Sequence, residues 1–196
     1  MKKLAAMLCL SAMTTGAFAQ GLVSFANNPQ TLISANIGGN VATLTGPAGS
    51  YYFGLLTSPT GGAGTWTFSG VYATNLVNTT GGRFSGNSGG SVAVPNWAPG
   101  ATLSFEVAGW AASLGTTFNP AWLVTAPNGL FGVSTVASGS AGGGGQSLPP
   151  LALFGASAIP TGFTLTSGGT PPVPEPSSMA LVGLGTAALL IFRRRK

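Results

Sequence analysis

Residues 102–107 read Thr102-Leu103-Ser104-Phe105-Glu106-Val107, with an apolar side chain at every second position. Alternation with a period of two is typical of a β-strand that buries one face and exposes the other. Because Glu106 alternates with three apolar residues, we expect its carboxylate to face solvent, either alone or paired with Arg83. The stretch therefore predicts one strand of a mainly β fold.

The same pattern recurs along residues 20–166, where short apolar runs are separated by Gly-Pro, Asn-Pro, Pro-Gly and Asn-Gly pairs. Such pairs mark turns between strands. About ten strands at intervals of roughly 10–15 residues predict an antiparallel β-sandwich, with a β-solenoid as the alternative. We expect the glycine-rich residues 139–150 to form a loop. Further strands are predicted at residues 23–25, 32–37, 41–44, 51–57, 65–73, 92–94, 121–125, 131–136 and 163–165.

Charge is scarce in this chain and concentrated at its ends. Charged residues make up 5% of the sequence, against roughly 25% in an ordinary soluble domain. Of the charges that give the net value of +5, only Arg83 and Glu106 lie between Lys3 and residue 172. Nucleic-acid binding requires clustered basic side chains on the folded domain, so we expect no nucleic-acid partner.

The predicted domain also lacks the usual catalytic side chains. The chain has no His and no Asp, and its single Cys, Cys9, precedes the domain. The Gly-x-Ser-x-Gly pattern around Ser88 has no base to activate the serine, so a turn is the better interpretation. A lone Glu106 cannot supply a pair of carboxylates or a cluster of metal ligands. We therefore expect a protein that is not an enzyme and that holds no cofactor or metal.

Aromatic residues offer a different kind of site, because exposed rings can stack on sugars. At strand spacing such rings more often belong to the core. Trp97, between Pro95 and Pro99 in a predicted loop, is the candidate for exposure. The other rings considered are Trp66, Trp110, Trp122, Tyr51, Tyr52 and Tyr72.

Residues 1–19 have the organisation of a secretory signal peptide. Lys2 and Lys3 precede an apolar run, and Ala17-Phe18-Ala19 is a small-x-small cleavage site. We expect signal peptidase to cut between Ala19 and Gln20. A lipoprotein leader ending at Cys9 and a buried N-terminal helix are the alternatives.

The C-terminal residues 173–196 have three parts. Pro174-Glu175-Pro176 comes first, residues 179–192 form an uncharged apolar run, and a basic cluster ends the chain. At about 1.5 Å per residue, a helix from 177 to 192 would be roughly 24 Å long, which is short for a bilayer core of about 30 Å. We expect a single transmembrane helix whose basic flank stays on the cytoplasmic side. A helix packed on the domain is the alternative. The flank consists of Arg193, Arg194, Arg195 and Lys196.

These three parts in this order resemble the PEP-CTERM sorting domain. The resemblance covers residues 173–196, and it implies that an exosortase, a membrane transpeptidase, reads Pro174, Glu175 and Pro176 and cuts there. Two prolines keep that strip out of a helix. Residues 167–172 would be the spacer between the sorting segment and the domain.

The sequence as a whole predicts an exported protein that is held briefly in the inner membrane and then delivered to the cell surface or the extracellular layer. The leading hypothesis for residues 20–166 is a structural, non-enzymatic role. The alternative is a carbohydrate-binding or adhesive module of the exopolysaccharide layer.

Overall fold

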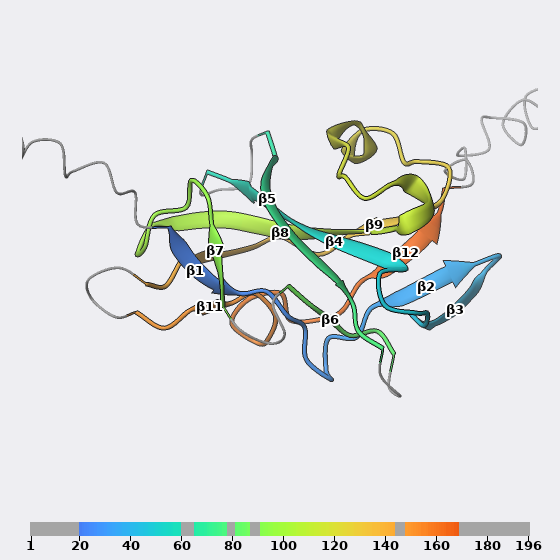
Figure 1. The fold of residues 1–196 in the computed structure, drawn as a ribbon, viewed down its shortest axis with the longest axis horizontal. Coiled ribbons are helices and arrows are strands. Elements are labelled where there is room, and N and C mark those ends of the chain that lie inside the picture. The colour runs from blue at the N-terminus through green and yellow to red at the C-terminus, as the bar shows by residue number, and fades with distance from the viewer. Residues whose placement is uncertain (1–19, 60–64, 78–80, 87–90, 144–147, 169–196) are drawn as a thin grey trace, which may run out of the picture.

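A computed structural model describes residues 20–59, 65–77, 81–86, 91–143 and 148–168, and these form a mainly β molecule (Figure 1). The prediction of a mainly β fold is confirmed. Short 3-10 helices η2 (Ala112–Leu114) and η3 (Pro120–Leu123) follow the longest strand. The strands are β1 (Gly21–Ser24), β2 (Ser34–Ile37), β3 (Asn40–Thr43), β4 (Tyr51–Ser58), β5 (Thr67–Asn75), β6 (Phe84–Ser85), β7 (Ser91–Val94), β8 (Thr102–Ala111), β9 (Leu130–Val133), β10 (Ala137–Ser140), β11 (Leu151–Ala152) and β12 (Thr164–Ser167).

The strands form two sheets. The small sheet has the order β11-β1-β7, and the large 9-stranded sheet has the order β3-β2-β12-β9-β8-β4-β5-β6, with β10 paired to β8. Isolated bridges join Leu22 to Gly142, just after β10, and Ala26 to Ser85 of β6. The β1 segment is therefore tied to two distant parts of a large sheet that curls.

Most strand pairs are antiparallel, as predicted, but two are parallel. β12 runs parallel to β2, and β1 runs parallel to β11. The prediction of an antiparallel sandwich is wrong for these pairs. Alternation of apolar residues indicates which face of a strand is buried, but it carries no information on the direction of the neighbouring strand.

The predicted strand at residues 121–125 is also wrong, because Pro120–Leu123 is the 3-10 helix η3. The Asn119 side chain caps this helix by accepting a hydrogen bond of 3.0 Å from the Ala121 N–H. Proline at the first helical position has a suitable φ and needs no N–H partner. The capped Asn-Pro start thus favours a helical turn over the extended form.

The glycine-rich segment begins later than predicted. Ala137–Ser140 is strand β10 and pairs with Phe105–Thr102 of β8, whereas residues 139–150 were expected to form a loop. A Cβ on Gly139 would overlap the Leu151 side chain, so glycine at this position lets Leu151 of β11 pack against β10. Residues 144–147 lie outside the described part.

The inner core, defined here as the buried cluster between β1 and the large sheet, is rich in aromatic residues. Phe53 of β4 stacks on Phe84 at 4.2 Å between ring centroids, and Phe84 also meets Phe25 edge-on at 5.5 Å. Buried Asn27 ties this region together. Its Nδ2 donates to the carbonyls of Thr31 and Gly82, and its Oδ1 accepts from the Phe84 N–H at 2.9 Å.

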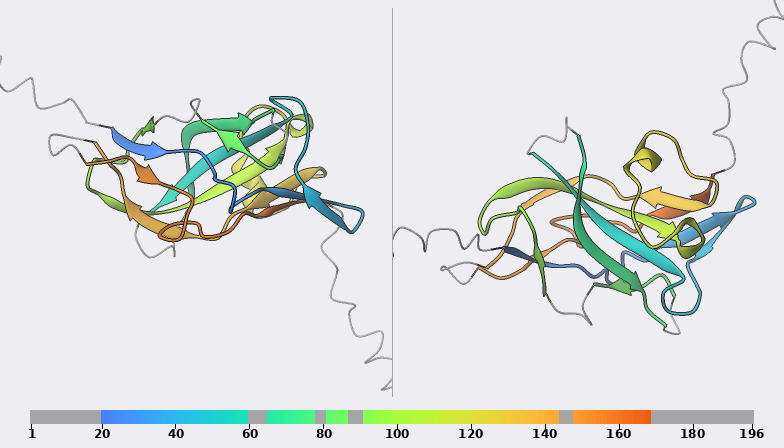
Figure 2. Two further views of the ribbon diagram at one scale, coloured as in Figure 1. Left: turned by 90° about the horizontal axis from the view of Figure 1, so that it is seen from below. Right: turned by 45° about the horizontal axis from the view of Figure 1, so that its top comes forward.

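The β2–β3 hairpin projects from the body of the molecule (Figure 2). Its turn residues Gly38 and Gly39 have φ of 61° and 88°. Two successive positive φ values define the tight turn that suits two twisted strands, and glycine adopts them without strain. Strand β12 ends beside this hairpin, whereas β1 begins at the other end of the long axis (Figure 1).

Candidate functional site

Aromatic side chains gather on the face of the large sheet opposite the inner core. Strand register places Tyr52 beside Trp110 on neighbouring strands and Tyr72 beside Gly54. A Cβ on Gly54 would come within 3.0 Å of Phe68 and 3.2 Å of Trp110, so glycine lets the rings close over β4. We call this set the aromatic face, and it consists of Tyr52, Trp66, Phe68, Tyr72, Trp110, Phe118, Trp122 and Phe131.

The rings of the aromatic face form a continuous network. Trp110 is fully buried and lies 5.8 Å from Trp122, which in turn lies 5.9 Å from both Phe118 and Phe131. Offset and edge-on contacts at these separations stabilise a fold beyond simple burial. The network therefore fastens the segment that contains η2 and η3 onto the sheet.

Two hydrogen bonds that involve aromatic side chains also hold this segment on the sheet. The Trp110 Nε1–H donates to the Gly115 carbonyl at 2.9 Å, and the Tyr72 hydroxyl accepts from the Phe118 N–H at 3.3 Å. Tyr52, Trp66, Phe68, Tyr72 and Trp122 stay partly exposed. Within the described ranges, the near-parallel ring pair on this face is Tyr52 with Trp110, and Trp110 is buried.

Glu106 lies on the side of the sheet that carries the aromatic face, opposite Leu56 in the strand register. It is only 6% exposed, so the prediction of a solvent-facing carboxylate is wrong. Burial raises the pKa of Glu106 to about 7, because a low-dielectric surrounding disfavours the charged form. The central strand β8 is covered on both faces, which alternation along a single strand does not reveal.

Buried hydroxyl groups lie near Glu106. Ser104 and Ser58 face each other across β8 and β4, and both are almost completely buried. The Ser58 Oγ has no hydrogen-bond partner among the described residues. The Ser104 Oγ lies 3.0 Å from the Ser138 Oγ. A carboxyl and hydroxyl groups thus share one end of the sheet.

Arg83 lies elsewhere and does not pair with Glu106. Within the part of the chain that the structure describes, no ion pair joins the two residues, so the alternative of a Glu106–Arg83 pair is not supported. Arg83 precedes Phe84 of the inner core, and its Nε is buried without a hydrogen-bond partner there. The two charges of the domain are therefore independent.

Trp97, the predicted exposed ring, is 1% exposed and belongs to the inner core. Its Nε1–H donates to the Ala101 carbonyl at 2.8 Å, and its ring lies 5.9 Å from Phe105. The prediction of exposure is wrong because the flanking turn, with Asn96 at φ 62°, folds the ring inward. Flanking prolines indicated the turn but not the direction of the side chain.

The outside of the domain carries hydroxyl groups and little charge. Thr102 and Ser140 are both exposed and lie 2.7 Å apart between their hydroxyl oxygens on β8 and β10. All of β3 is exposed. Among the described residues the only charged side chains are Arg83 and Glu106.

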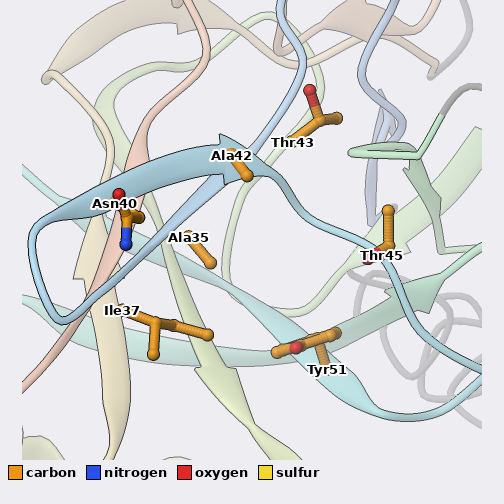
Figure 3. A pocket seen from close by; sticks show the side chains of 7 residues that line it. All are labelled: Ala35, Ile37, Asn40, Ala42, Thr43, Thr45 and Tyr51. Atoms are coloured by element: carbon orange, nitrogen blue, oxygen red, sulfur yellow. The ribbon is translucent and has the colours of Figure 1, made fainter.

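A shallow pocket of about 370 Å³ lies between the β2–β3 hairpin and β4 (Figure 3). Its polar groups are uncharged. It lacks the convergent charged or perturbed groups that usually mark a catalytic pocket. Its lining residues are Ala35, Ile37, Asn40, Ala42, Thr43, Thr45 and Tyr51.

Several predicted site residues lie outside the described residues. These are Ala19, Pro174, Glu175, Pro176, Arg193, Arg194, Arg195 and Lys196, as well as the serine of the Gly-x-Ser-x-Gly pattern. Gln20, the predicted first mature residue, is described and exposed. Among the described residues, no helix has the length and apolar character needed to cross a bilayer, and no three potential metal-ligating side chains come together.

The fold and the tail define a mainly β domain followed by a C-terminal sorting segment. The family model of the PEP-CTERM protein-sorting motif matches residues 172–196, so this chain is a PEP-CTERM domain-containing protein. The motif implies an exported protein with a transient membrane association and an exosortase as its processing partner. No curated protein and no solved structure matches the chain.

Proposed function

We propose that this chain is the precursor of a structural, non-enzymatic protein of the cell surface or the extracellular matrix. The observation that carries the proposal is the sorting motif at residues 172–196, placed directly behind a β domain. That motif specifies a destination outside the cytoplasm. The β domain is the part that would remain there after processing.

The route has two cleavages. Signal peptidase removes residues 1–19 at Ala19–Gln20, and the apolar tail with its basic flank holds the domain in the inner membrane. Exosortase then cuts at Pro174-Glu175-Pro176 and releases the domain. Strand β12 ends at Ser167, which leaves a short spacer before that strip.

The surface of the domain supports a structural role. Its exposed strands carry Ser, Thr and Asn rather than charged residues, as on β3 and along the Thr102–Ser140 contact. Uncharged hydroxyl surfaces suit hydrogen bonding to a hydrated polymer. The domain also has no His, Asp or Cys, which are common sources of catalytic bases and nucleophiles.

A carbohydrate-binding or adhesive role is the second candidate. The partly exposed rings of the aromatic face favour it, because Tyr52, Trp66 and Trp122 lie on one side of the sheet. Against it, these rings do not form an exposed coplanar platform, since the partner of Tyr52 in the near-parallel pair is buried.

The test is mass spectrometry of the mature termini in a host with an exosortase and in one without it. We expect a product that starts at Gln20 and ends near Pro176 in the first host alone. Replacing Pro174, Glu175 and Pro176 with Ala should abolish the C-terminal cut, whereas Thr170→Ala with Pro171→Ala should not. An intact 196-residue chain in the first host would overturn the route.

Hydrolysis of polysaccharide or peptide by the purified mature protein would overturn the non-enzymatic part of the proposal. Retention of the protein on an exopolysaccharide gel would favour the second candidate function. These outcomes are independent of the processing test, because they concern the domain rather than its tail.

A further inference from the structure

The end of the domain from which the tail leaves carries several large exposed apolar side chains. Ile37 and Val41 flank the tip of the β2–β3 hairpin and are 60% and 63% exposed. Val124, directly after η3, is 90% exposed. Exposed apolar groups that gather in one region often mark an interaction surface.

The strand register places these residues near the exit of the tail. Thr166 of β12 pairs with Asn36 of β2, so Ser167 lies level with the hairpin tip. The Gly168 N–H donates to the Gly129 carbonyl at 3.0 Å, which ties the exit to the segment that follows Val124. We call Ile37, Val41, Val124 and their surroundings the tail-side end.

The hairpin tip presents apolar groups on both of its faces. Ile37 lies on the face of β2 that lines the pocket with Ala35 (Figure 3). Val41 pairs with Asn36, the residue between them, and therefore lies on the other face. The turn between them is Gly38-Gly39. The tip is therefore a narrow, uncharged wedge with a small turn.

The remaining chain is too short to carry this end far from a membrane. Residues 169–178 separate Gly168 from the apolar run, and an extended chain of ten residues reaches at most about 36 Å. A short tether of this kind gives a high effective concentration of the surface at its attached end. Weak apolar contacts are then sufficient for binding.

We propose that the tail-side end rests on the phospholipid surface of the membrane that holds the tail, with Ile37, Val41 and Val124 in contact with lipid. This inference rests on the proposed route, in which the tail is membrane-embedded. The contact orients the domain with the start of β1 away from the bilayer (Figure 1).

The chemistry of this end fits a lipid interface better than a charged partner. No charged side chain of the described residues lies on the hairpin or on residues 112–129. Aliphatic side chains that enter the headgroup boundary gain apolar burial, and nearby Asn and Thr can stay hydrated. Asn36, Asn40 and Thr43 surround the two apolar residues on the hairpin.

The test uses the chain from Gln20 to Lys196, the form left after signal-peptide removal, reconstituted through its tail into vesicles of phosphatidylethanolamine and phosphatidylglycerol. An environment-sensitive fluorophore is attached at Asn40→Cys, and in a second sample at Ala98→Cys near the start of β1. We expect spin-labelled lipids to quench the label at position 40 and not the label at position 98. Equal quenching at both positions, or at neither, would overturn the proposal.

A double variant adds a quantitative check. Ile37→Ser with Val41→Ser should lower the ratio of lipid-contacting to free hairpin about tenfold, since partial burial of two aliphatic side chains is worth roughly that factor. The matched control is Val136→Ser with Leu148→Ser, which changes two exposed apolar residues away from the tail exit. We expect the control to leave quenching unchanged, and equal losses in both variants would contradict the assignment.

Two further outcomes separate the causes of failure. If the chain does not float with vesicles at all, the tail is not embedded and the proposed route fails with it. A second outcome is that the chain floats, but the emission of the label at position 40 shifts as much in detergent at high protein concentration as it does in vesicles. In that case a second copy, paired along the exposed β3 edge, covers the hairpin instead of lipid. That result would overturn the lipid contact and leave the sorting route intact.

Discussion

The two faces of the large sheet are both rich in aromatic residues, yet they are built differently. On the inner face, the β1 segment and the small sheet close the core, and Phe25, Phe53 and Phe84 are fully buried. On the outer face, a segment with two short 3-10 helices covers only part of the rings. Partly exposed aromatic residues and a buried carboxyl group remain there.

The difference shows which face can carry a function. A closed core of buried, packed rings contributes stability and leaves no ring exposed to a ligand at Phe25, Phe53 or Phe84. The outer face combines half-exposed rings with Glu106, whose raised pKa reflects burial without a charged partner among the described residues. Perturbed groups of this kind are found more often at functional sites than elsewhere.

Phe53→Ala should have the largest effect, because Phe53 is fully buried and contacts both Phe84 and Phe163. Removal of a buried aromatic ring costs about 4 kcal/mol of unfolding free energy. Urea denaturation of the mature chain measures this loss. Phe68→Ala on the outer face, where the ring is half-exposed, is the control and should cost less than half as much. Equal losses would mean that the two faces are equally closed.

Asn27→Ala should have the next largest effect, a loss of about 3 kcal/mol of unfolding free energy. Asn27 makes three hydrogen bonds to backbone groups near the inner core, and its removal leaves the buried Phe84 N–H without that acceptor. Amide exchange of residues 82–84 should rise together with the loss of stability. A variant at Asn28, which bonds only within its own turn, should cost much less. If both variants behave alike, Asn27 does not connect the two sheets.

The sequence predicted the strands of both faces but not how they are covered. Alternation found β8 and β4, since buried and polar positions are local in the sequence. Glu106 lies opposite Leu56 of β4 in the strand register, and coverage by so distant a part of the chain cannot be read from alternation along β8. Trp97 was misplaced for a similar reason, because the rotation of one turn decided its direction. The parallel pairing of β12 with β2 likewise joins segments that are more than a hundred residues apart in the chain.

Glu106→Gln tests the outer face through its pH dependence. The pKa of Glu106 is raised from 4.5 to about 7 in the folded state, so the native state binds more protons than the unfolded state between those values. The unfolding free energy of the wild-type protein should therefore fall by roughly 2–3 kcal/mol in total as pH rises from about 4.5 to 7. Above that pH it should level off. Glu106→Gln should remove this fall and be the more stable protein at pH 8.

The control for this prediction is Arg83→Gln, which removes the other charge of the domain without touching Glu106. Denaturation midpoints at pH 5 and pH 8 should differ in this variant as in the wild-type protein. A wild-type protein with the same stability at both pH values would show that Glu106 is hydrated. The outer face would then be more open than the structure describes.

Trp122→Ala should have the smallest effect on stability and the most direct bearing on function. Trp122 is half-exposed, so loss of its contacts with Trp110, Phe118 and Phe131 should cost only about 1 kcal/mol. Affinity electrophoresis in exopolysaccharide gels compares its mobility with that of the wild-type protein and of Phe68→Ala. If the wild-type protein is retarded and Trp122→Ala is not, the outer face binds sugar and the domain is an adhesive module. If neither is retarded, the rings serve to attach residues 112–123 to the sheet, and the uncharged hydroxyl surface is the better explanation for a role in the extracellular layer.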